Sequence, residues 1–327
     1  MNILVTGGAG YIGSHTCKAL AAAGFNPVVY DNISRGYERA IKWGKWVKGD
    51  LSDHAHLVRS LIDYKIEAVV HFAAYIVVGE SSSDPAAYYQ NNVLGTLSLL
   101  SAMKQAHVKK IVFSSTAAVY GTPKSVPLTE DHPLEPINPY GWSKFMSEKM
   151  ILDFQRSYGF QGMILRYFNA SGADPELEVG EDHVPETHLI PLVVRAALGG
   201  KPLQIFGNDY PTNDGSCIRD YIHVSDLAQA HVLALQKINT SNQSGIYNLG
   251  NGSGYSVFEV IKVVEAVSGK KVPTTIVPRR VGDPATLIAN SSLAKAELGW
   301  CPKYAELETI VKGTYEWELG REFRSGL

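Results

Sequence analysis

The stretch Asn2-Ile3-Leu4-Val5-Thr6-Gly7-Gly8-Ala9-Gly10-Tyr11-Ile12-Gly13 decides the fold of this chain. Its first residues are short, apolar and β-branched, which is typical of a buried parallel strand. The glycines then follow the pattern Gly8-x-Gly10-x-x-Gly13, and the residues from Ser14 to Ala23 favour a helix. A strand, a glycine turn and a helix in this order predict a dinucleotide site, with the pyrophosphate at the helix N-terminus.

The composition is that of an ordinary globular protein. The chain has 327 residues, of which 45% are hydrophobic and 19% are charged, and its formal net charge is -2. This length suggests two domains or one large α/β unit, and the charge gives no argument for a nucleic-acid or membrane partner. No apolar run approaches the thickness of a bilayer, and no signal peptide precedes the first strand. We therefore expect a cytoplasmic protein that binds neither nucleic acid nor membrane.

The cysteines point to a reducing compartment. The chain has three of them, Cys17, Cys217 and Cys301, far apart and without a C-x-x-C pair. This spacing predicts no cysteine zinc site, and we assign no metal ligand anywhere in the sequence.

The first half of the chain alternates apolar strands with helical stretches. This alternation predicts the α/β class, with a doubly wound parallel sheet (a Rossmann fold) and a smaller mixed α/β substrate-binding region. We expect strands at 2–5, 27–30, 45–48, 68–72, 110–115 and 161–167, and helices at 14–23, 54–64, 85–106 and 140–158. Beyond residue 169 the loops lengthen, and shorter helices are expected at 188–198, 224–235, 257–267 and 291–298.

These patterns suggest a division of the chain into two domains. We predict a nucleotide-binding Rossmann domain at 1–168 and a mainly substrate-binding domain at 169–327. Later segments, for example within 223–250, are expected to return to the first sheet, with 245–249 as an added strand. Ligands of such sheets bind outside the carboxyl ends of the strands, so polar residues at those ends become candidates for the site.

Asp31 ends the second predicted strand, eighteen residues after Gly13. A carboxylate there can accept hydrogen bonds from ribose hydroxyls and repels a 2′-phosphate, which favours NAD over NADP. A turn-forming aspartate is the plain alternative, and Arg35 and Arg39 nearby could hold a phosphate instead. Asp50, after the third strand, suits the adenine edge, with helix capping as its alternative.

Tyr140 and Lys144 are four residues apart, so on a helix they share one face. A tyrosine with its ordinary pKa near 10 is a poor base, but a nearby ammonium and a cationic nicotinamide would lower that pKa. Pro139 places Tyr140 at the start of the helix. Taken alone, a Tyr-x-x-x-Lys pattern is more simply a solvated helix pair.

The fifth predicted strand ends in the hydroxyl residues Ser114-Ser115-Thr116. The Thr116 hydroxyl could share a substrate proton with Tyr140. Strand-end hydroxyls that only satisfy backbone groups are the alternative. The glycine turn, this hydroxyl and the Tyr140–Lys144 pair, in this order, make a more specific signal than any one of them.

At these residues the sequence resembles the extended short-chain dehydrogenase/reductase family, and within it the UDP-sugar 4-epimerases, over nearly the whole chain. The stretches that carry the resemblance are 7–13, 31–32, 49–50, 78–81, 88–93, 114–121, 140–144, 165–169, 205–212, 219–224 and 279–283. The resemblance implies tightly held NAD, which accepts hydride from C4 of a UDP-hexose while Tyr140 takes the proton of the 4-hydroxyl. Return of hydride to the other face of the 4-keto sugar would interconvert UDP-glucose and UDP-galactose.

The resemblance also implies which residues touch each ligand. Lys144 would bridge the nicotinamide ribose, and Thr116 would hold the sugar hydroxyl. The implied NAD contacts are Gly7, Gly10, Tyr11, Ile12, Gly13, Asp31, Asn32, Asp50, Leu51, Phe72, Ala73, Ala74, Asn91, Ser114, Tyr140, Lys144 and Tyr167. The implied UDP-hexose contacts are Thr116, Tyr140, Asn169, His188, Leu189, Gln204, Phe206, Arg219, Tyr221, Arg280, Asp283 and Leu287.

The diphosphate needs cations, and guanidinium groups can donate two parallel hydrogen bonds to phosphate oxygens. Arg219 and Arg280 match the diphosphate positions of the family, with Asp283 accepting from the uridine ribose. A surface salt bridge is the alternative for each arginine, and Asp220 is a plausible partner for Arg219. His188 and Leu189 stand where other members carry Asn-Leu.

Alanines follow Thr116 at 117 and 118, where relatives that dehydrate or decarboxylate their substrates usually carry carboxylates. Alanine cannot move a proton, which favours epimerisation without elimination. A UDP-pentose 4-epimerase, a net NAD(H)-dependent oxidoreductase and a non-catalytic nucleotide-sugar-binding protein remain as alternatives.

The sequence departs from the family in two places. Ile76 replaces a lysine that touches NAD, so cofactor contact there must be weaker or made by another group. Leu287 occupies a position that is tyrosine in glucose-restricted members, so we expect room for an N-acetyl group on the sugar. The family is often dimeric through the helices at 85–106 and 140–158, and we expect a homodimer.

Overall fold

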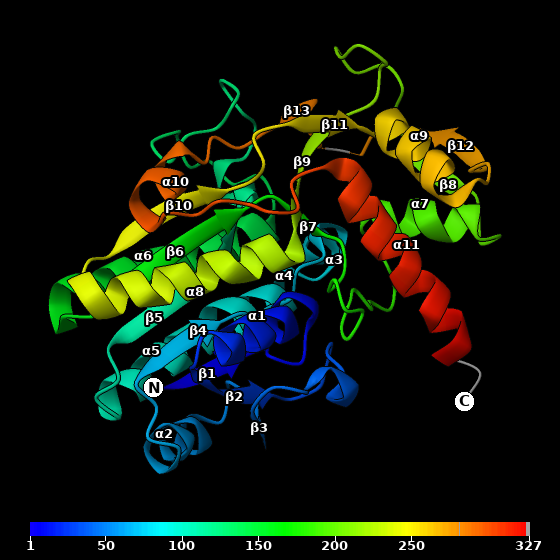
Figure 1. The fold of residues 1–327 in the computed structure, drawn as a ribbon. Helices are drawn as coiled ribbons and strands as arrows, with labels where there is room; N and C mark the ends of the chain where they lie inside the picture. Colours follow the sequence, from blue (N-terminus) through cyan, green and yellow to red (C-terminus); the bar gives the residue numbers. More distant parts are fainter. Residues whose placement is uncertain (281, 325–327) are drawn as a thin grey trace.

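The computed structural model describes residues 1–280 and 282–324, and the side chains up to residue 320 except residue 281. A seven-stranded parallel sheet forms the core of its first unit. The strands of this sheet are β1 (Asn2–Thr6), β2 (Asn26–Asp31), β3 (Lys45–Lys48), β4 (Ala68–His71), β5 (Lys110–Thr116), β6 (Gln161–Tyr167) and β10 (Gly245–Leu249). Their spatial order is β10-β6-β5-β4-β1-β2-β3, and every pairing is parallel (Figure 1). The predicted doubly wound sheet is therefore confirmed.

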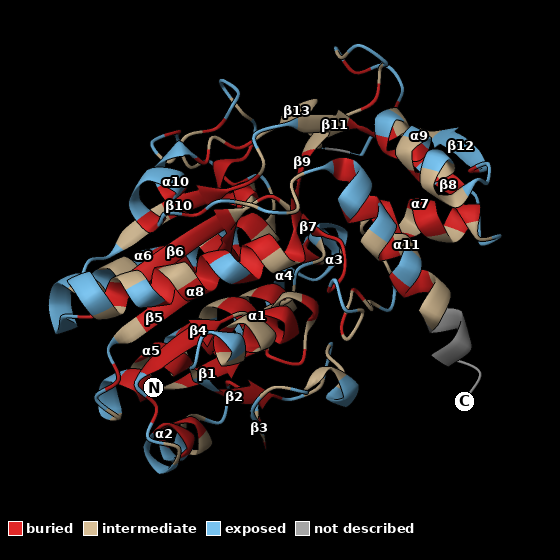
Figure 2. Cartoon of the chain, viewed as in Figure 1, coloured by how far each residue is buried: buried red, intermediate tan, exposed pale blue. Residues whose placement is uncertain are grey.

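Helices cover both faces of this sheet (Figure 1). On one face lie α1 (Tyr11–Ala22), α8 (Val224–Ser241) and α10 (Ser292–Leu298), and on the other lie α2 (His54–Asp63), α5 (Gly95–Gln105) and α6 (Pro139–Tyr158). Successive residues of a strand point to opposite faces, so Ile3 and Val5 enter the first core and Leu4 enters the second. Both faces are buried, which explains the continuous apolar runs of the strands (Figure 2).

A second unit is built on a smaller sheet. Its strands are β7 (Asn169–Ser171), β9 (Ile218–His223), β11 (Gly254–Ser256) and β13 (Thr286–Leu287). The other three strands all pair with β9. A separate pair joins β8 (Leu203–Phe206) to β12 (Thr274–Val277). The helices α7 (Leu189–Ala197), α9 (Val257–Ser268) and α11 (Leu307–Arg324) enclose the core of this unit.

The chain passes between the two units several times. After β9, α8 and β10 return to the first sheet, and β11 to β13 then lie in the second unit. Trp300, just after α10, is buried in the first core and donates from Nε1 to the Asp226 carbonyl at 2.9 Å. The Asp226 carboxylate accepts the backbone N–H groups of Lys303 and Tyr304, each at 2.8 Å. These bonds fasten the segment before α11 to α8.

The structure differs from the sequence-based expectation in several elements. Helix α1 begins at Tyr11 rather than Ser14, so Gly13 lies inside it, where a Cβ would stand 2.2 Å from the Gly7 carbonyl oxygen. The helix expected at 85–106 is divided into α4 (Pro85–Tyr88), a π turn η2 (Tyr89–Leu94) and α5, and α3 (Val78–Ser83) precedes it. Two 3-10 turns, η1 (Glu38–Ala40) and η3 (Ala117–Tyr120), complete the elements. None of the described helices is long and apolar enough to cross a membrane.

Candidate active site

The carboxyl end of β5 meets the first turn of α6. Asn138 caps this helix, because its Oδ1 accepts the backbone N–H of Gly141 at 2.8 Å, and Pro139 occupies the first helical position. Glycine is required at 141, since a Cβ there would stand 2.6 Å from the carbonyl oxygen of Ala118. The close approach of the two backbones holds Tyr140 beside the end of the strand.

The three residues predicted to be catalytic come together at this junction. The hydroxyl of Tyr140 lies close enough to Thr116 for that side chain to act on the Tyr140 pKa, and Thr116 Oγ1 accepts the backbone N–H of Ala118 at 3.1 Å. Lys144, one turn further along α6, is only 3% exposed and donates from Nζ to the Ser114 carbonyl at 2.9 Å. A phenol, a hydroxyl and an ammonium thus lie at the strand ends, where a doubly wound sheet binds its ligand.

Burial moves the pKa values of this pair in opposite directions. It raises the pKa of Tyr140 to about 12, although the Thr116 hydrogen bond works against that rise. It lowers the pKa of Lys144 to about 7, against the opposing effect of the Glu148 carboxylate. In the chain alone, burial disfavours both charged forms. The predicted lowering of the Tyr140 pKa also depends on the cationic nicotinamide, and it stays a prediction.

Sequence reasoning missed a buried ion pair behind Lys144. Glu148 and Arg166 are 1% and 2% exposed, and two hydrogen bonds of 2.9 and 2.7 Å join the guanidinium to the carboxylate. Glu148 also accepts the hydroxyl of Ser115 at 2.5 Å, and Arg166 donates to the hydroxyl of Tyr120 at 3.1 Å. The sequence held one signal, since Glu148 continues the four-residue spacing of Tyr140 and Lys144 on α6.

The glycine turn fits a dinucleotide. Gly7 has φ +73, and a Cβ there would stand 2.6 Å from the backbone nitrogen of Ala73, so the turn packs directly on the loop after β4. Gly10 caps α1 without any side-chain hydrogen bond, and the first turn contains no acidic residue. The first N–H groups of a helix have no partner within it, so those of Tyr11 and Ile12 can bind a pyrophosphate.

Asp31 lies at the end of β2, beside this turn. Its carboxylate accepts the backbone N–H groups of Ala9 at 3.0 Å and Ile33 at 2.8 Å, which leaves further lone pairs for ribose hydroxyls. Asn32 donates to Asp50 at 2.6 Å, which links the ends of β2 and β3. The capping alternative for Asp50 does not hold, because Asp53 caps α2.

The other predicted NAD residues line the same edge of the sheet. The backbone N–H groups of Phe72 and Ala73 donate to the Thr6 carbonyl at 2.9 and 3.1 Å, with Ala74 next in the chain. The hydroxyls of Ser114 and Tyr167 are hydrogen-bonded to each other across β5 and β6.

Asn91 lies in the π turn η2, and Leu51 lies in the core beside it. Asn91 belongs to the π turn η2, and its amide donates to Asn92 at 2.9 Å. Asn92 donates in turn to the hydroxyl of Ser143 at 2.9 Å, beside Lys144. Leu51 is buried in the core that α5 covers. The π turn therefore connects a predicted cofactor contact to the catalytic helix, a placement typical of functional sites.

A cation does lie near the position where the family lysine is lost. Ile76 is 40% exposed, and the guanidinium of Arg35 lies 5.0 Å from the ring centre of its neighbour Tyr75. Arg35 also pairs with Glu80 at 2.5 Å. The loop after β2 and the loop after β4 are thus in contact through Arg35.

The predicted UDP-sugar residues surround β9. Arg219 pairs with Asp283, and the backbone of Leu287 on β13 pairs with that of Arg219. The suggestion that Asp220 pairs with Arg219 is wrong. Asp220 is fully buried and accepts the backbone N–H groups of Asn251, Gly252 and Ala289 at 2.8, 3.0 and 3.1 Å.

The remaining predicted contacts lie on neighbouring strands. The guanidinium carbon of Arg280 is 3.8 Å from the ring centre of Phe206 at the end of β8, and Gln204 is exposed on the same strand. Asn169 donates to the Asp220 carbonyl at 2.8 Å, and Tyr221 is buried on β9. Val281, within the stretch 279–283, lies outside the described residues.

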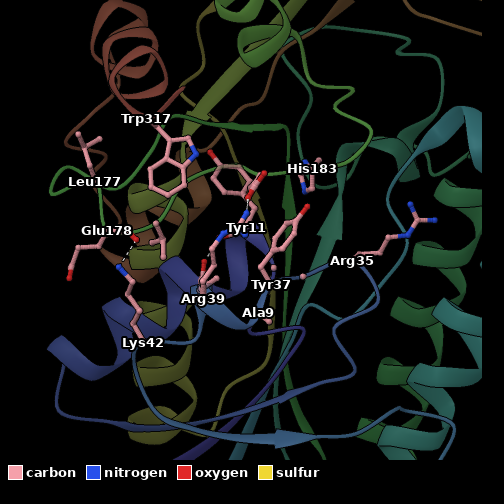
Figure 3. Close-up of a pocket in the computed structure, with 17 residues that line it drawn as sticks. Ala9, Tyr11, Arg35, Tyr37, Arg39, Lys42, Leu177, Glu178, His183 and Trp317 are labelled. Atoms are coloured by element: carbon pink, nitrogen blue, oxygen red, sulfur yellow. Dashed lines mark hydrogen bonds and ion pairs between the residues drawn. The ribbon is translucent and has the colours of Figure 1, made fainter. Parts of the chain in front are cut away.

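A cavity of about 330 Å³ lies beside the glycine turn (Figure 3). Tyr11, Tyr37 and Arg39 line it from the first unit, and His183 and Trp317 line it from the second. None of Thr116, Tyr140 and Lys144 contributes to its wall. His188, predicted as a substrate contact, forms a hydrogen bond to Glu181 in the loop that borders this cavity, and Leu189 begins α7.

Comparison with known proteins gives consistent matches over the whole chain. The NAD dependent epimerase/dehydratase family matches residues 3–250. The UDP-glucose 4-epimerase of Halalkalibacterium halodurans is 52% identical over 318 residues, which cover 97% of this chain and 95% of the relative.

Two solved structures are similar in both fold and sequence. The UDP-glucose 4-epimerase from Brucella ovis in complex with NAD has a TM-score of 0.94 at 48% identity, covering 96% of this chain and 97% of the other. The UDP-Glc/GlcNAc 4-epimerase of Campylobacter jejuni has a TM-score of 0.85 at 42% identity, covering 98% and 99%. The full length of the chain is therefore similar to these enzymes.

Proposed function

The chain belongs to the NAD dependent epimerase/dehydratase family, and we infer that it is an NAD-dependent enzyme that interconverts UDP-glucose and UDP-galactose by epimerisation at C4 of the sugar. The observation that carries this conclusion is the convergence of Tyr140, Thr116 and buried Lys144 at the end of β5. The glycine turn that fits a dinucleotide follows β1, which is separated from β5 by β4 in the sheet. A coenzyme and an acid–base group can therefore act on one bound sugar.

Each residue of this site has a distinct task in the reaction. Bound NAD would supply reversible hydride exchange at C4 of the sugar. The Tyr140 oxygen takes the proton of the 4-hydroxyl as the 4-keto sugar forms and returns it when the alcohol forms again. Thr116, which lies close to Tyr140, orients that hydroxyl. Ala117 and Ala118 provide no further acid or base, so the sugar is not dehydrated.

The acidity of Tyr140 requires positive charge from its surroundings. Burial raises its pKa to about 12 in the chain alone, which disfavours the phenolate at neutral pH. The ammonium form of Lys144 supplies one positive charge on the same helix face, and an oxidised nicotinamide carries another. The base is therefore formed only in the complex with oxidised coenzyme.

The cations on and near β9 suit the diphosphate of the substrate. Arg219 is largely buried, with its side chain 12% exposed, and Arg280 is exposed against Phe206. We assign both to the diphosphate and Asp283 to the uridine ribose, with Gln204 and Phe206 beside the uracil. Because Asp283 pairs with Arg219 in the chain alone, substrate binding has to rearrange this ion pair.

A panel of UDP-sugars offered to the purified enzyme without added NAD tests the function. We expect UDP-galactose to be converted to UDP-glucose, and denaturation to release about one NAD per chain. Conversion of UDP-pentoses alone would favour the pentose epimerase. Consumption of added NAD in each turnover would instead favour a net oxidoreductase, and nucleotide binding without turnover a non-catalytic protein.

A second substrate class, the N-acetylated UDP-hexoses, is favoured by the size of Leu287. This residue packs against the apolar cluster that contains Ala117 and Phe168, directly after the catalytic Thr116. Leucine is smaller than the tyrosine of glucose-restricted relatives, and the Campylobacter jejuni enzyme, at 42% identity, acts on both UDP-Glc and UDP-GlcNAc. We propose that this enzyme also accepts UDP-GlcNAc.

Changing Leu287 to tyrosine should lower kcat/KM for UDP-GlcNAc at least about 10-fold, because the ring fills the space of the N-acetyl group. The value for UDP-galactose should change less than about 3-fold, since its 2-hydroxyl is smaller. Leu293→Tyr on α10, where the leucine is 37% exposed, is the matched control. Equal losses for both sugars, or no UDP-GlcNAc turnover by the parent enzyme, would refute the assignment.

We propose that the enzyme is a homodimer that pairs through α5 and α6. Large apolar side chains are exposed on and next to these adjacent helices: Leu94 at 57%, Leu97 at 39%, Trp142 at 40%, Met146 at 39% and Tyr158 at 41%. Such a patch is typical of a protein–protein interface. Sedimentation equilibrium should give twice the chain mass, and Leu97→Glu should shift it toward the monomer. A monomeric parent enzyme would contradict this proposal.

The proposed reaction places the enzyme in galactose metabolism. Its three cysteines are free thiols, one of them buried. Free thiols are typical of a reducing compartment, which supports a cytoplasmic location.

A further inference from the structure

Four potential metal ligands gather in the loop that precedes α7. They are Glu181, His183, Glu186 and His188, and each offers one nitrogen or oxygen within 4.8 Å of all the others. Glu181 Oε1 lies 3.0 Å from His183 Nδ1 and is also hydrogen-bonded to His188 Nδ1. Glu186 Oε1 lies 3.8 Å from His183 Nδ1. No step of the proposed reaction uses Glu181, His183 or Glu186.

Two of the separations in this cluster are close to those of a tetrahedral metal site. Zinc binds imidazole nitrogen and carboxylate oxygen at about 2.1 Å, which places the ligand atoms of a tetrahedron about 3.4 Å apart. The separations of 3.0 and 3.8 Å lie on either side of this value. Two imidazoles with two carboxylates and no thiolate form a donor set that zinc accepts and that magnesium and calcium do not favour.

The charge of the cluster also calls for a cation. The side chains of Glu181 and Glu186 are each only 2% exposed, and burying a carboxylate without a positive partner is costly. Arg195 donates to Glu186 at 3.3 Å, but it forms two shorter bonds of 3.0 and 2.8 Å with Glu318. Arg195 is thus shared between Glu186 and Glu318, and among the described residues the ion-pair partners of Glu181 are the imidazoles of His183 and His188, so the charge of Glu181 is balanced only by protonated imidazole or a bound cation.

We propose that Glu181, His183, Glu186 and His188 bind one divalent transition-metal cation per chain, with Zn²⁺ the best match to the donor set. In the absence of a cation, imidazolium groups would take its place. The side chain of His188 is 40% exposed and leaves a path by which an ion can enter.

The surroundings hold the ligands in place, as a metal site requires. Glu186 Oε1 accepts the backbone N–H groups of Thr187 at 2.8 Å and His188 at 3.0 Å. Trp317 on α11 donates from Nε1 to the Glu181 carbonyl at 2.9 Å. The neighbouring acidic group differs, because Asp174, Glu176 and Glu178 already surround the ammonium of Lys18.

The position of the cluster indicates a structural role for the ion. The His183 ring meets the Tyr11 ring edge-on at 6.2 Å, at the start of α1 (Figure 3). His188 precedes the first residue of α7. Arg39 from the first unit pairs with Asp182 in the same loop. A bound cation would fix this loop between the glycine turn and the helices of the second unit.

Zinc binding to the purified holoenzyme tests the proposal. The protein, with its nucleotide retained, is dialysed against EDTA and titrated with ZnCl₂ by calorimetry, and Tm is measured with and without zinc. We expect one equivalent of zinc per chain, a higher Tm with zinc, and weaker binding as the pH falls because imidazole must lose its proton. Co²⁺ in the site should give a spectrum without thiolate charge transfer, which excludes the three cysteines.

Variants locate the site. His183→Gln should weaken zinc binding at least about 100-fold, since loss of a ligand exceeds the usual effect of its outer partners. Glu176→Gln and His107→Asn, which remove an exposed carboxylate and an exposed imidazole elsewhere, should bind as the parent does. No stoichiometric binding by the parent, or unchanged binding by both His183→Gln and Glu181→Gln, would overturn the proposal. If Glu181→Gln fails to fold, zinc binding by His183→Gln, at a less buried residue, and the Tm of the parent with and without zinc still test the proposal.

Discussion

Phenylalanine at position 140 should lower kcat for UDP-galactose by at least about 10²-fold, the usual contribution of a positioned acid–base group. The change removes only the phenolic oxygen near Thr116, so the ring and the start of α6 should keep their positions. Without that oxygen the 4-hydroxyl has no base on this helix, because the Lys144 ammonium is held on the Ser114 carbonyl. The loss should therefore appear in kcat, with little change in the binding of UDP.

Tyr158→Phe is the matched control for this experiment. Tyr158 ends the same helix, 41% exposed, and packs against Phe154 away from the site. It should keep the parent kcat, and both variants should retain bound NAD and an unchanged Tm. Turnover by Tyr140→Phe within a few-fold of the parent would remove Tyr140 from the mechanism.

Glu148→Gln should lower the free energy of unfolding by about 3–5 kcal/mol, because it leaves the buried guanidinium of Arg166 without its charge partner. Arg166 is 2% exposed, and the remaining bond to Tyr120 cannot balance its charge. The change also removes the negative charge that supports the ammonium form of Lys144, so turnover should fall as well. Urea denaturation followed by fluorescence measures the first effect, and kcat measures the second.

Two further variants separate the ion pair from general damage to α6. Asp153→Asn breaks an exposed pair with Arg156 on the same helix and should cost less than about 1 kcal/mol. The double variant Glu148→Gln with Arg166→Met removes both charges and should be more stable than Glu148→Gln alone. A double variant as unstable as the single one would show that the pair does not act through its charge.

The first sheet could be predicted from the sequence almost to the residue, because a parallel strand buried on both faces is a continuous apolar run. The strands of the second unit could not. β9 reads Ile-Arg-Asp-Tyr-Ile-His, and its charged residues find partners only through tertiary contacts such as Asp220 with the backbone near Gly252. Helix α11 was not expected either, because Gly313, which lies in its interior, is unfavourable in a helix. The division into 1–168 and 169–327 stays a prediction.

The candidate site could be predicted as far as local spacing reaches. Tyr140 and Lys144 are one turn apart, so their common face follows from the sequence alone. The Glu148–Arg166 pair and the Glu181 cluster could not be predicted, because they form where separate elements meet. The pKa of Tyr140 could not be predicted either, because it depends on how deeply packing buries the hydroxyl. The contacts that these residues make with NAD and the UDP-sugar stay predictions, because the structure gives the positions of the residues but holds neither ligand.

The several passes of the chain between the two units affect how the protein folds as it is synthesised. Residues 1–168 hold six of the seven parallel strands, yet the face of the sheet beside α1 is closed only by α8, α10 and Trp300. Until the ribosome has added those residues, this apolar face and the open edge of β6 stay exposed to other chains. The newborn polypeptide therefore remains prone to aggregation until synthesis is nearly complete, and chaperones would have to protect it for most of that time.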